Sequence, residues 1–219
     1  IYAKTSGGLV GVNNGTLNIS SSFVASNIGS SDKNTITGGL VGNNLGNLNI
    51  DKSYADCYLY GSTVSGIACN NEFKPFTLTN SYSAGFILTE EINATAAGLV
   101  CGGANTINNT YTVIYKGLLD NSRNAGGVAG FYGAKGTDLN DKSTYFATVG
   151  FTGTTFNNVY FKQKGLNGTT DHGAQRDSFS VGDLDASVFS LKGISHRYMM
   201  MGASLTSYNY PKLINMDHY

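Results

Sequence analysis

A short glycine-rich motif returns at nearly even intervals along this chain, and it restricts the possible folds more than any other feature. Successive copies are about 27 to 32 residues apart, a period that is typical of solenoids and other repeat arrays. Each repeat of such an array packs against its neighbours, so equivalent residues should lie side by side. The copies are Gly7–Gly11, Gly38–Gly42, Gly66–Cys69, Gly98–Cys101 and Gly126–Gly130.

A second motif lies between successive copies of the first. It consists of an apolar residue, three mostly polar residues, an aromatic residue and usually a small residue. Fixed apolar and aromatic positions with variable residues between them are what stacked coils require, because each position must match the coils on either side. The copies are Ile19–Phe23, Ile50–Tyr54, Leu78–Tyr82, Ile107–Tyr111 and Phe156–Tyr160, and Tyr145 belongs to a looser copy.

The sequence predicts an all-β fold, a right-handed parallel β-helix of about five coils with roughly 30 residues each. From Ile1 to Phe161, short runs of β-branched and aromatic residues alternate with Gly, Asn and Asp, without helical periodicity. Glycine accounts for 29 of the 219 residues and charged residues for 13%, which suits tight turns between strands. We assign residues 1–161 to the repeats and residues 162–219 to a C-terminal segment of the same domain.

Stacking of the repeats predicts two columns of side chains. The apolar residue after the glycines should form a buried column, and the second motif should form a column of stacked rings. The glycines would allow a positive φ at a corner or a close approach to the next coil. The alternative role for the rings is a stacking platform for a sugar or a nucleotide. The apolar column is Leu9, Leu40, Ile67, Leu99 and Val128, and the aromatic column is Phe23, Tyr54, Tyr82, Tyr111 and Tyr145.

The three cysteines do not suggest a disulfide framework, because their number is odd. Cys69 and Cys101 occupy the same position of the glycine-rich motif, so they should be neighbours on adjacent coils, about 4.8 Å apart. We expect buried, reduced thiols at this small-residue position, although the spacing also permits a disulfide. No histidine or further cysteine lies within ligand spacing of them, so no metal site is expected.

The C-terminal segment is predicted to cap the last coil. Ser180 and Asp183 resemble an N-cap pair, and apolar residues then recur at helical spacing, which predicts one short helix that ends before Gly193. A cap would cover the open strand edges of the final coil. The alternative is a ligand-binding module whose polar groups are Asp183, Asp185 and His196. The apolar residues of the predicted helix are Val181, Leu184, Val188 and Leu191.

Charge and composition argue against several classes of partner. Lys plus Arg equals Asp plus Glu, 14 each, so no basic stripe points to nucleic acid. No apolar run is long enough to span a bilayer, so membrane insertion is not expected. The first residue, Ile1, lies inside a repeat and is not Met, so we expect a monomeric segment of a longer chain.

No catalytic constellation is recognised, so we do not expect an enzyme, a catalytic or metal site, or a cofactor. The chain lacks the His-Glu-x-x-His motif of zinc peptidases. A β-helix can also cleave polysaccharides, which requires two carboxylates converging on one groove. Candidates for that alternative are Asp138, Asp141 and Asp171, but no Asp or Glu recurs from coil to coil.

The repeat unit resembles the GLUG motif of large bacterial surface proteins. The copy from Gly38 to Cys57, GGLVGNNLGNLNIDKSYADC, is a close match, and the copy beginning at Gly7 is nearly as close. The later copies are degenerate, and the resemblance covers about Gly7 to Tyr160. GLUG repeats occur in adhesin-like proteins and beside the catalytic domain of IgA-cleaving metallopeptidases.

The resemblance implies a non-catalytic scaffold of a secreted or cell-wall-attached bacterial protein. Such a scaffold would bind a host protein or a glycan, or it would act as a spacer next to another domain. Three alternatives stay open: an accessory region of an IgA-type metallopeptidase, a β-helix enzyme that cleaves polysaccharide, and a purely intracellular structural repeat.

Overall fold

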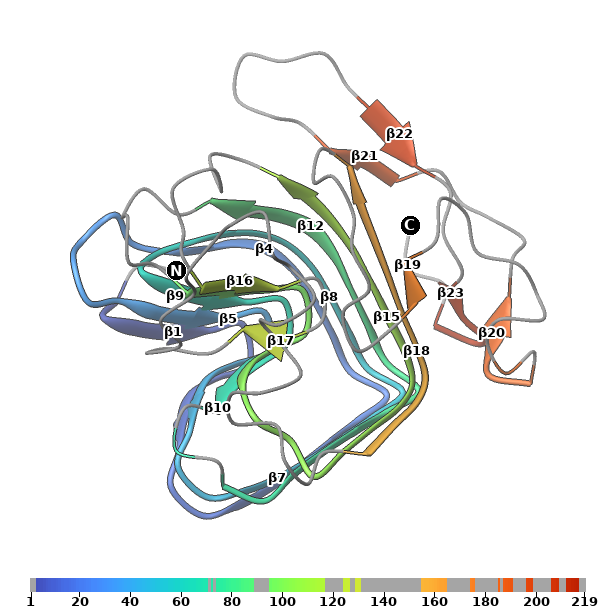
Figure 1. The fold of residues 1–219 in the computed structure, drawn as a ribbon, viewed down its shortest axis with the longest axis horizontal. Helices are drawn as coiled ribbons and strands as arrows, with labels where there is room; N and C mark the ends of the chain where they lie inside the picture. Colours follow the sequence, from blue (N-terminus) through green and yellow to red (C-terminus); the bar gives the residue numbers. More distant parts are fainter. Residues whose placement is uncertain are drawn as a thin grey trace.

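A computed structural model shows an all-β protein whose parallel strands stack as a β-solenoid (Figure 1). The prediction of a parallel β-helix is therefore confirmed, although the described residues form about three complete turns of four strands where about five coils are expected. The described residues are 3–70, 72, 74–88, 95–116, 124–126, 129–130, 155–164, 174–175, 185, 187–190, 196–198, 206–208 and 212–216.

The first three coils share one plan of four strands each. Gly-Gly-Leu and Asn-Gly turns separate the first three strands of the first coil, and a sharp corner precedes its fourth strand. The strands are β1 (Thr5–Gly7), β2 (Val10–Asn13), β3 (Thr16–Ser20) and β4 (Phe23–Gly29) in the first coil, β5 (Ile36–Gly38), β6 (Val41–Asn44), β7 (Asn47–Asp51) and β8 (Tyr54–Tyr60) in the second, and β9 (Thr63–Ser65), β10 (Ala68–Asn70), β11 (Phe76–Thr79) and β12 (Tyr82–Leu88) in the third.

The fourth coil follows the same path, but its last two strands join into one long strand. Its strands are β13 (Thr95–Ala97), β14 (Val100–Gly102) and β15 (Thr106–Lys116). Strands β16 (Asn124–Gly126), β17 (Ala129–Gly130) and β18 (Thr155–Lys164) pair with the strands of the fourth coil and extend the stack into a fifth coil, of which the structure describes parts. Strand β19 (Ala174–Gln175) pairs in turn with β18.

Three parallel sheets form the walls of the solenoid. Two have five strands each, in the orders β1-β5-β9-β13-β16 and β17-β14-β10-β6-β2. The third has nine strands and bends at the corner between β3 and β4 and at the equivalent corners of later coils (Figure 1). At each corner one residue adopts the left-handed conformation, with φ between 46° and 49°, at Ser21, Lys52, Asn80 and Asn109.

The apolar column fills the interior as predicted at Leu40, Ile67 and Leu99, each of which is fully buried. The prediction is wrong for Leu9, which is 45% exposed. Leu9 belongs to the outermost described coil, so its neighbour on one side is Leu40 and no described coil covers its other side. Val128 lies outside the described residues.

The paired glycines allow a close approach between coils. A Cβ atom on Gly39 would lie 2.0 Å from the Gly66 carbonyl oxygen and 2.5 Å from the Ala55 Cβ. Ala55 directly follows the aromatic residue of the second motif and points into the interior. The glycine of one motif and the small residue of the other are therefore the two sides of one narrow contact. Neither Gly39 nor Ala55 has a φ value in the left-handed region. The close approach between coils, and not a positive φ, therefore explains why position 39 is a glycine.

An asparagine ladder holds the turn between the second and third strands of the first three coils. Asn13 Nδ2 donates to Asn44 Oδ1 at 2.7 Å, and Asn44 Nδ2 donates to Asn70 Oδ1 at 3.0 Å. All three side chains are buried. Since buried amides are costly unless they are paired, this ladder fixes the register of the stacked turns.

The predicted C-terminal helix is wrong at its described residues. Ser187 and Val188 form a turn, and Phe189 starts a strand, β20 (Phe189–Ser190), which pairs antiparallel with β23 (Lys212–Leu213). Asp185 Oδ1 accepts hydrogen bonds from the backbone N and the Oγ of Ser187, and the pairing of Phe189 with Leu213 then continues the described backbone as a strand. A second antiparallel pair is formed by β21 (His196–Tyr198) and β22 (Thr206–Tyr208).

Candidate functional site

The outer flank of the bent sheet carries a continuous stack of aromatic rings. Ring centroids along Phe23, Tyr54, Tyr82 and Tyr111 are 5.2, 4.7 and 5.0 Å apart, with interplanar angles of 16°, 4° and 6°. The parallel register places these residues directly opposite one another. The predicted aromatic column is therefore confirmed for these four residues, although it lies outside the solenoid interior.

The fifth member of the aromatic column was predicted wrongly. The register places Tyr160, and not Tyr145, opposite Tyr111. Tyr160 belongs to a complete copy of the second motif, in which Phe156 is the register partner of Ile107. Asp141 stands at the equivalent position before Tyr145, so that copy lacks the apolar residue that a coil needs. Tyr145 itself lies outside the described residues.

The described part of the C-terminal segment covers this aromatic column. The Phe189 ring meets the Tyr111 ring edge to face with centroids 5.6 Å apart, and Leu213 and Met216 are buried in the same apolar cluster. The Asp185 backbone N donates to Asn109 Oδ1 at 2.9 Å. In Figure 1, β20 and β23 accordingly lie beside β15 and β18, outside the outline of the coils.

The prediction of an end cap is therefore wrong for the residues that the structure describes between 185 and 216. Their apolar side chains pack sideways on the aromatic column and not across the last coil. The physical reason is that a row of outward rings offers a long apolar surface, and burying it is as favourable as covering an end.

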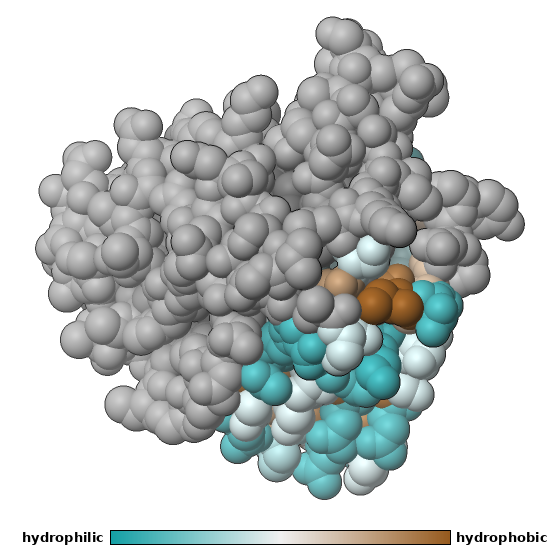
Figure 2. All heavy atoms as spheres, turned by 90° about the vertical axis from the view of Figure 1, so that its right-hand side faces the viewer, coloured by the Kyte–Doolittle hydropathy of each residue, from teal (hydrophilic) through white to brown (hydrophobic). Residues whose placement is uncertain are grey.

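A groove lies between the C-terminal segment and the corner of the first two coils. It encloses about 350 Å³, at the lower end of the size range of small-molecule sites. Figure 2 looks at this flank and shows an apolar area bordered by hydrophilic side chains. The solenoid contributes Ser21 and Lys52, and the C-terminal segment contributes Ser187, Val188, Leu213, Ile214, Asn215 and Met216.

The lining of the groove combines several kinds of chemistry. Its apolar part includes Ile214, which is 40% exposed, and the buried residues Leu213 and Met216. Two hydroxyl groups and one amide provide donors and acceptors, and Lys52 is the charged residue among the described lining. Sequence reasoning missed this site, because its two sides lie far apart in the chain and neither side has a recognisable motif.

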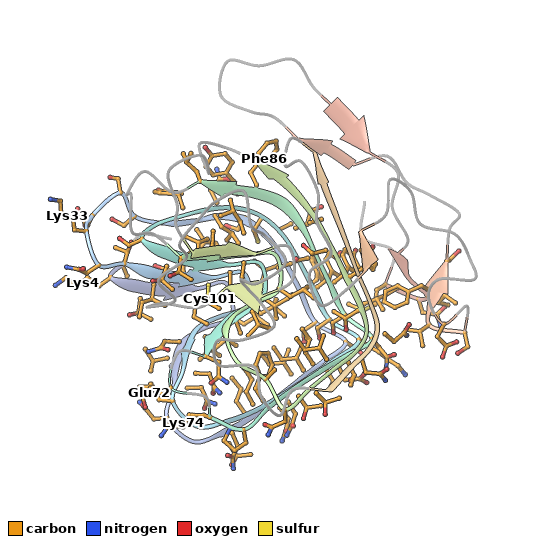
Figure 3. All side chains as sticks on the ribbon, viewed as in Figure 1. Lys4, Lys33, Glu72, Lys74, Phe86 and Cys101 are labelled. Atoms are coloured by element: carbon orange, nitrogen blue, oxygen red, sulfur yellow. The ribbon has the colours of Figure 1, made fainter. Side chains whose placement is uncertain are left out.

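A second set of aromatic residues lies further along the same outer face. Tyr58 contacts the ring of Phe86 with centroids 6.0 Å apart and that of Tyr60 with centroids 6.2 Å apart. Tyr58 and Tyr60 are partly exposed, whereas Phe86, labelled in Figure 3, is buried. The partly exposed rings add apolar surface to a flank that is otherwise polar.

The buried tyrosines of the column act as neutral rings. Burial and, to a lesser extent, the nearby Asp56 carboxylate raise the pKa of Tyr54 to about 12. Burial raises the pKa of Tyr82 well above its ordinary value, and Tyr54 and Asp56 add to this effect. Both phenols therefore keep their protons near neutral pH, so the column stacks and packs without taking up charge.

The two aligned cysteines are neighbours on adjacent coils, as predicted. Cys69 pairs in register with Cys101, and both are buried free thiols, as is Cys57. Cys101 Sγ donates to the Val64 carbonyl oxygen at 3.0 Å. Figure 3 shows Cys101 inside the coil. Burial raises the pKa of the Cys57 thiol to about 12 and that of Cys101 well above its ordinary value, where Cys69 adds to the effect.

The thiols are expected to be inert while the protein is folded. Without denaturant, a thiol-reactive chromophore should label none of the three at an appreciable rate, because all three side chains are buried and out of its reach. In denaturant, three thiols should titrate, and a Cys57→Ser variant should give two. A count of one in the unmodified protein would show that Cys69 and Cys101 form a disulfide.

The acidic candidates give no convergent pair among the described residues. Asp138, Asp141, Asp171 and Asp183 lie outside them. Asp185 is exposed, and hydrogen bonds from Ser187 lower its pKa. His196 lies in β21 opposite Tyr208, and no group of three or more metal-ligating side chains occurs in the described part of the chain.

No family model, no curated protein and no solved structure matches this chain. A search of the described segments for a membrane-spanning helix finds none.

Proposed function

We propose that this chain is a non-catalytic solenoid scaffold of a secreted or cell-surface bacterial protein that binds glycan through its outer flank. The observation that supports the proposal is the groove beside the corner of the first two coils. Hydroxyl and amide groups line it together with an apolar floor, and sugars present both polar edges and apolar ring faces.

The stacked coils support the scaffold part of this proposal. The interior of the described coils is occupied by apolar side chains and by the asparagine ladder. Ligand binding therefore falls to the outer surface, where residues differ from coil to coil. The resemblance to surface-protein repeats is the basis for the proposed location.

The test is a binding screen of the whole chain against an array of host glycans and matrix proteins. We expect glycan binding that weakens about tenfold in an Ile214→Ala variant, because the floor loses apolar contact area. Val12→Ala is the matched control, since Val12 is 42% exposed, close to the 40% of Ile214, and it lies in β2. The control should bind like the unmodified protein.

Three outcomes would contradict the proposal. Binding to no glycan on the array would remove its basis, and equal losses in the two variants would place the binding surface elsewhere. Release of reducing ends from plant, mucin or wall polysaccharides would show an enzyme instead of a scaffold.

A further inference from the structure

The corner residues of the solenoid form a column in which one member differs in chemistry. Ser21, Lys52, Asn80 and Asn109 share φ values between 46° and 49°. Asparagine tolerates this left-handed conformation better than most residues, whereas a long side chain such as lysine is unusual there. The backbone therefore does not explain why the second coil carries Lys52 at its corner.

The Lys52 ammonium group is not neutralised by a carboxylate within the described structure. Lys52 is exposed and forms no ion pair with a described residue. The adjacent acid, Asp51, is engaged elsewhere, since its Oδ1 accepts from Thr79 Oγ1 at 2.7 Å and from Asn80 Nδ2 at 2.8 Å. The described lining of the groove holds no acidic residue. Lys52 is therefore the charged residue of the described lining, and the Asp185 carboxylate beside the lining accepts both hydrogen bonds from Ser187.

We infer that the groove selects sugars that carry a carboxylate, such as uronic or sialic acids, and that Lys52 binds the carboxylate. This inference rests on the proposed function, because it names the class of glycan for the same groove. A charge-assisted hydrogen bond from the ammonium group is about twice as strong as a neutral one, so it distinguishes an acidic sugar from a neutral one.

The uncharged residues of the lining match the ring face and the hydroxyl groups of such a sugar. Ile214 and Met216 offer apolar surface to a ring face, and Ser21, Ser187 and Asn215 offer groups that hydrogen-bond hydroxyls. A fatty acid would use the cation and the apolar residues but would leave the Ser21 hydroxyl and the Asn215 amide without ligand partners, which carries a cost on desolvation. The mixed lining therefore favours a sugar acid.

The experiment compares a charged probe with its neutral ester. The whole chain is titrated with the methyl glycosides of glucuronic acid and of N-acetylneuraminic acid, and with the methyl ester of each. We expect at least one acid to bind about tenfold more tightly than its ester. Its binding should also weaken as salt is raised, because the charged site is exposed.

The equivalent corner residues of the later coils suggest which substitution to make at Lys52. Lys52→Asn removes the charge and places at this corner the residue that Asn80 and Asn109 provide in later coils, so the backbone conformation is retained. It should reduce affinity for the acid to that for the ester, whereas Lys52→Arg should keep the preference. Lys33→Gln is the matched control, since Lys33 is exposed and lies on the side of the solenoid away from the C-terminal segment (Figure 3).

The outcomes separate this inference from the proposed function. Equal affinity for acid and ester, or equal effects of Lys52→Asn and Lys33→Gln, would overturn it. Neutral glycans whose binding depends on Ile214 but not on Lys52 would overturn the inference and leave the proposed function standing. Absence of all glycan binding would remove both.

Discussion

Replacing Gly39 by alanine is expected to destabilise the protein more than any other single change considered, by at least about 3 kcal/mol. The new Cβ would lie 2.0 Å from the Gly66 carbonyl oxygen and 2.5 Å from the Ala55 Cβ. Neither atom is at the end of a flexible side chain, so the second and third coils would have to move apart. That movement would break the backbone hydrogen bonds that join these coils. Urea unfolding followed by far-ultraviolet circular dichroism measures the effect.

A second glycine provides a control that separates the steric clash of a new Cβ atom from the general effect of replacing glycine by alanine. Gly15 lies in the exposed turn before β3, and a Cβ there would meet no atom within 4 Å. Gly15→Ala should therefore change the free energy of unfolding by no more than about 0.5 kcal/mol. Equal stabilities of the two variants would contradict the close approach between coils at Gly39.

Truncating Leu40 to alanine is expected to cost about 2 to 5 kcal/mol, the usual range for a buried leucine. Leu40 is fully buried between Leu9 and Ile67, so the missing side chain would leave a cavity that neighbouring coils cannot fill. Leu9→Ala removes the same atoms at the equivalent position of the outermost described coil. It should cost less than about 1 kcal/mol, because Leu9 is 45% exposed.

The pair of leucine variants tests the stacking order as well as burial. Thermal and urea unfolding of both proteins, compared with the unmodified chain, give the two differences in stability. Similar losses in the two variants would mean that Leu9 is covered in solution, for example by self-association. Size-exclusion chromatography at several protein concentrations would identify that case.

The repeat explains how a scaffold of similar coils can carry one specific site. Each described coil places a residue at the same corner with the same backbone conformation, so the scaffold offers equivalent positions at regular spacing. At this corner the second coil alone among the four carries a cation, Lys52. The proposed binding site thus arises where the sequence departs from its own repeat.

Several features of the fold follow from the repeat period alone. Equal motif positions predicted that Cys69 and Cys101 are neighbours, and they predicted the stacking of Tyr54 on Tyr82. These predictions hold because a parallel solenoid translates a sequence period directly into contact between coils. Residues that occupy the same motif position then become partners without any knowledge of the tertiary structure.

Local patterns were less reliable where the repeat ends. Val188 fits helical spacing, but the Asx turn at Asp185 and the pairing of Phe189 with Leu213 impose a turn and a strand. The aromatic ring of Tyr145 is by itself the reason to place this residue in the aromatic column. The register depends equally on the apolar residue of the motif, four positions before the ring. The spacing of apolar residues within a short segment gives no information about the strand or surface with which the segment pairs, and that partner determines its conformation.

The period of the repeat is enough to predict the parallel β-solenoid, the pairing of its first four coils and the buried positions Leu40, Ile67 and Leu99, because these depend on contacts between equivalent positions. Two features are visible in the folded chain alone: the C-terminal segment lies on the outer aromatic column, and Lys52 lines a groove together with Leu213, Ile214 and Met216. The physical reason is that burial of apolar surface is non-directional. The pattern of apolar residues shows that a segment must be covered, and the three-dimensional arrangement selects the surface that covers it.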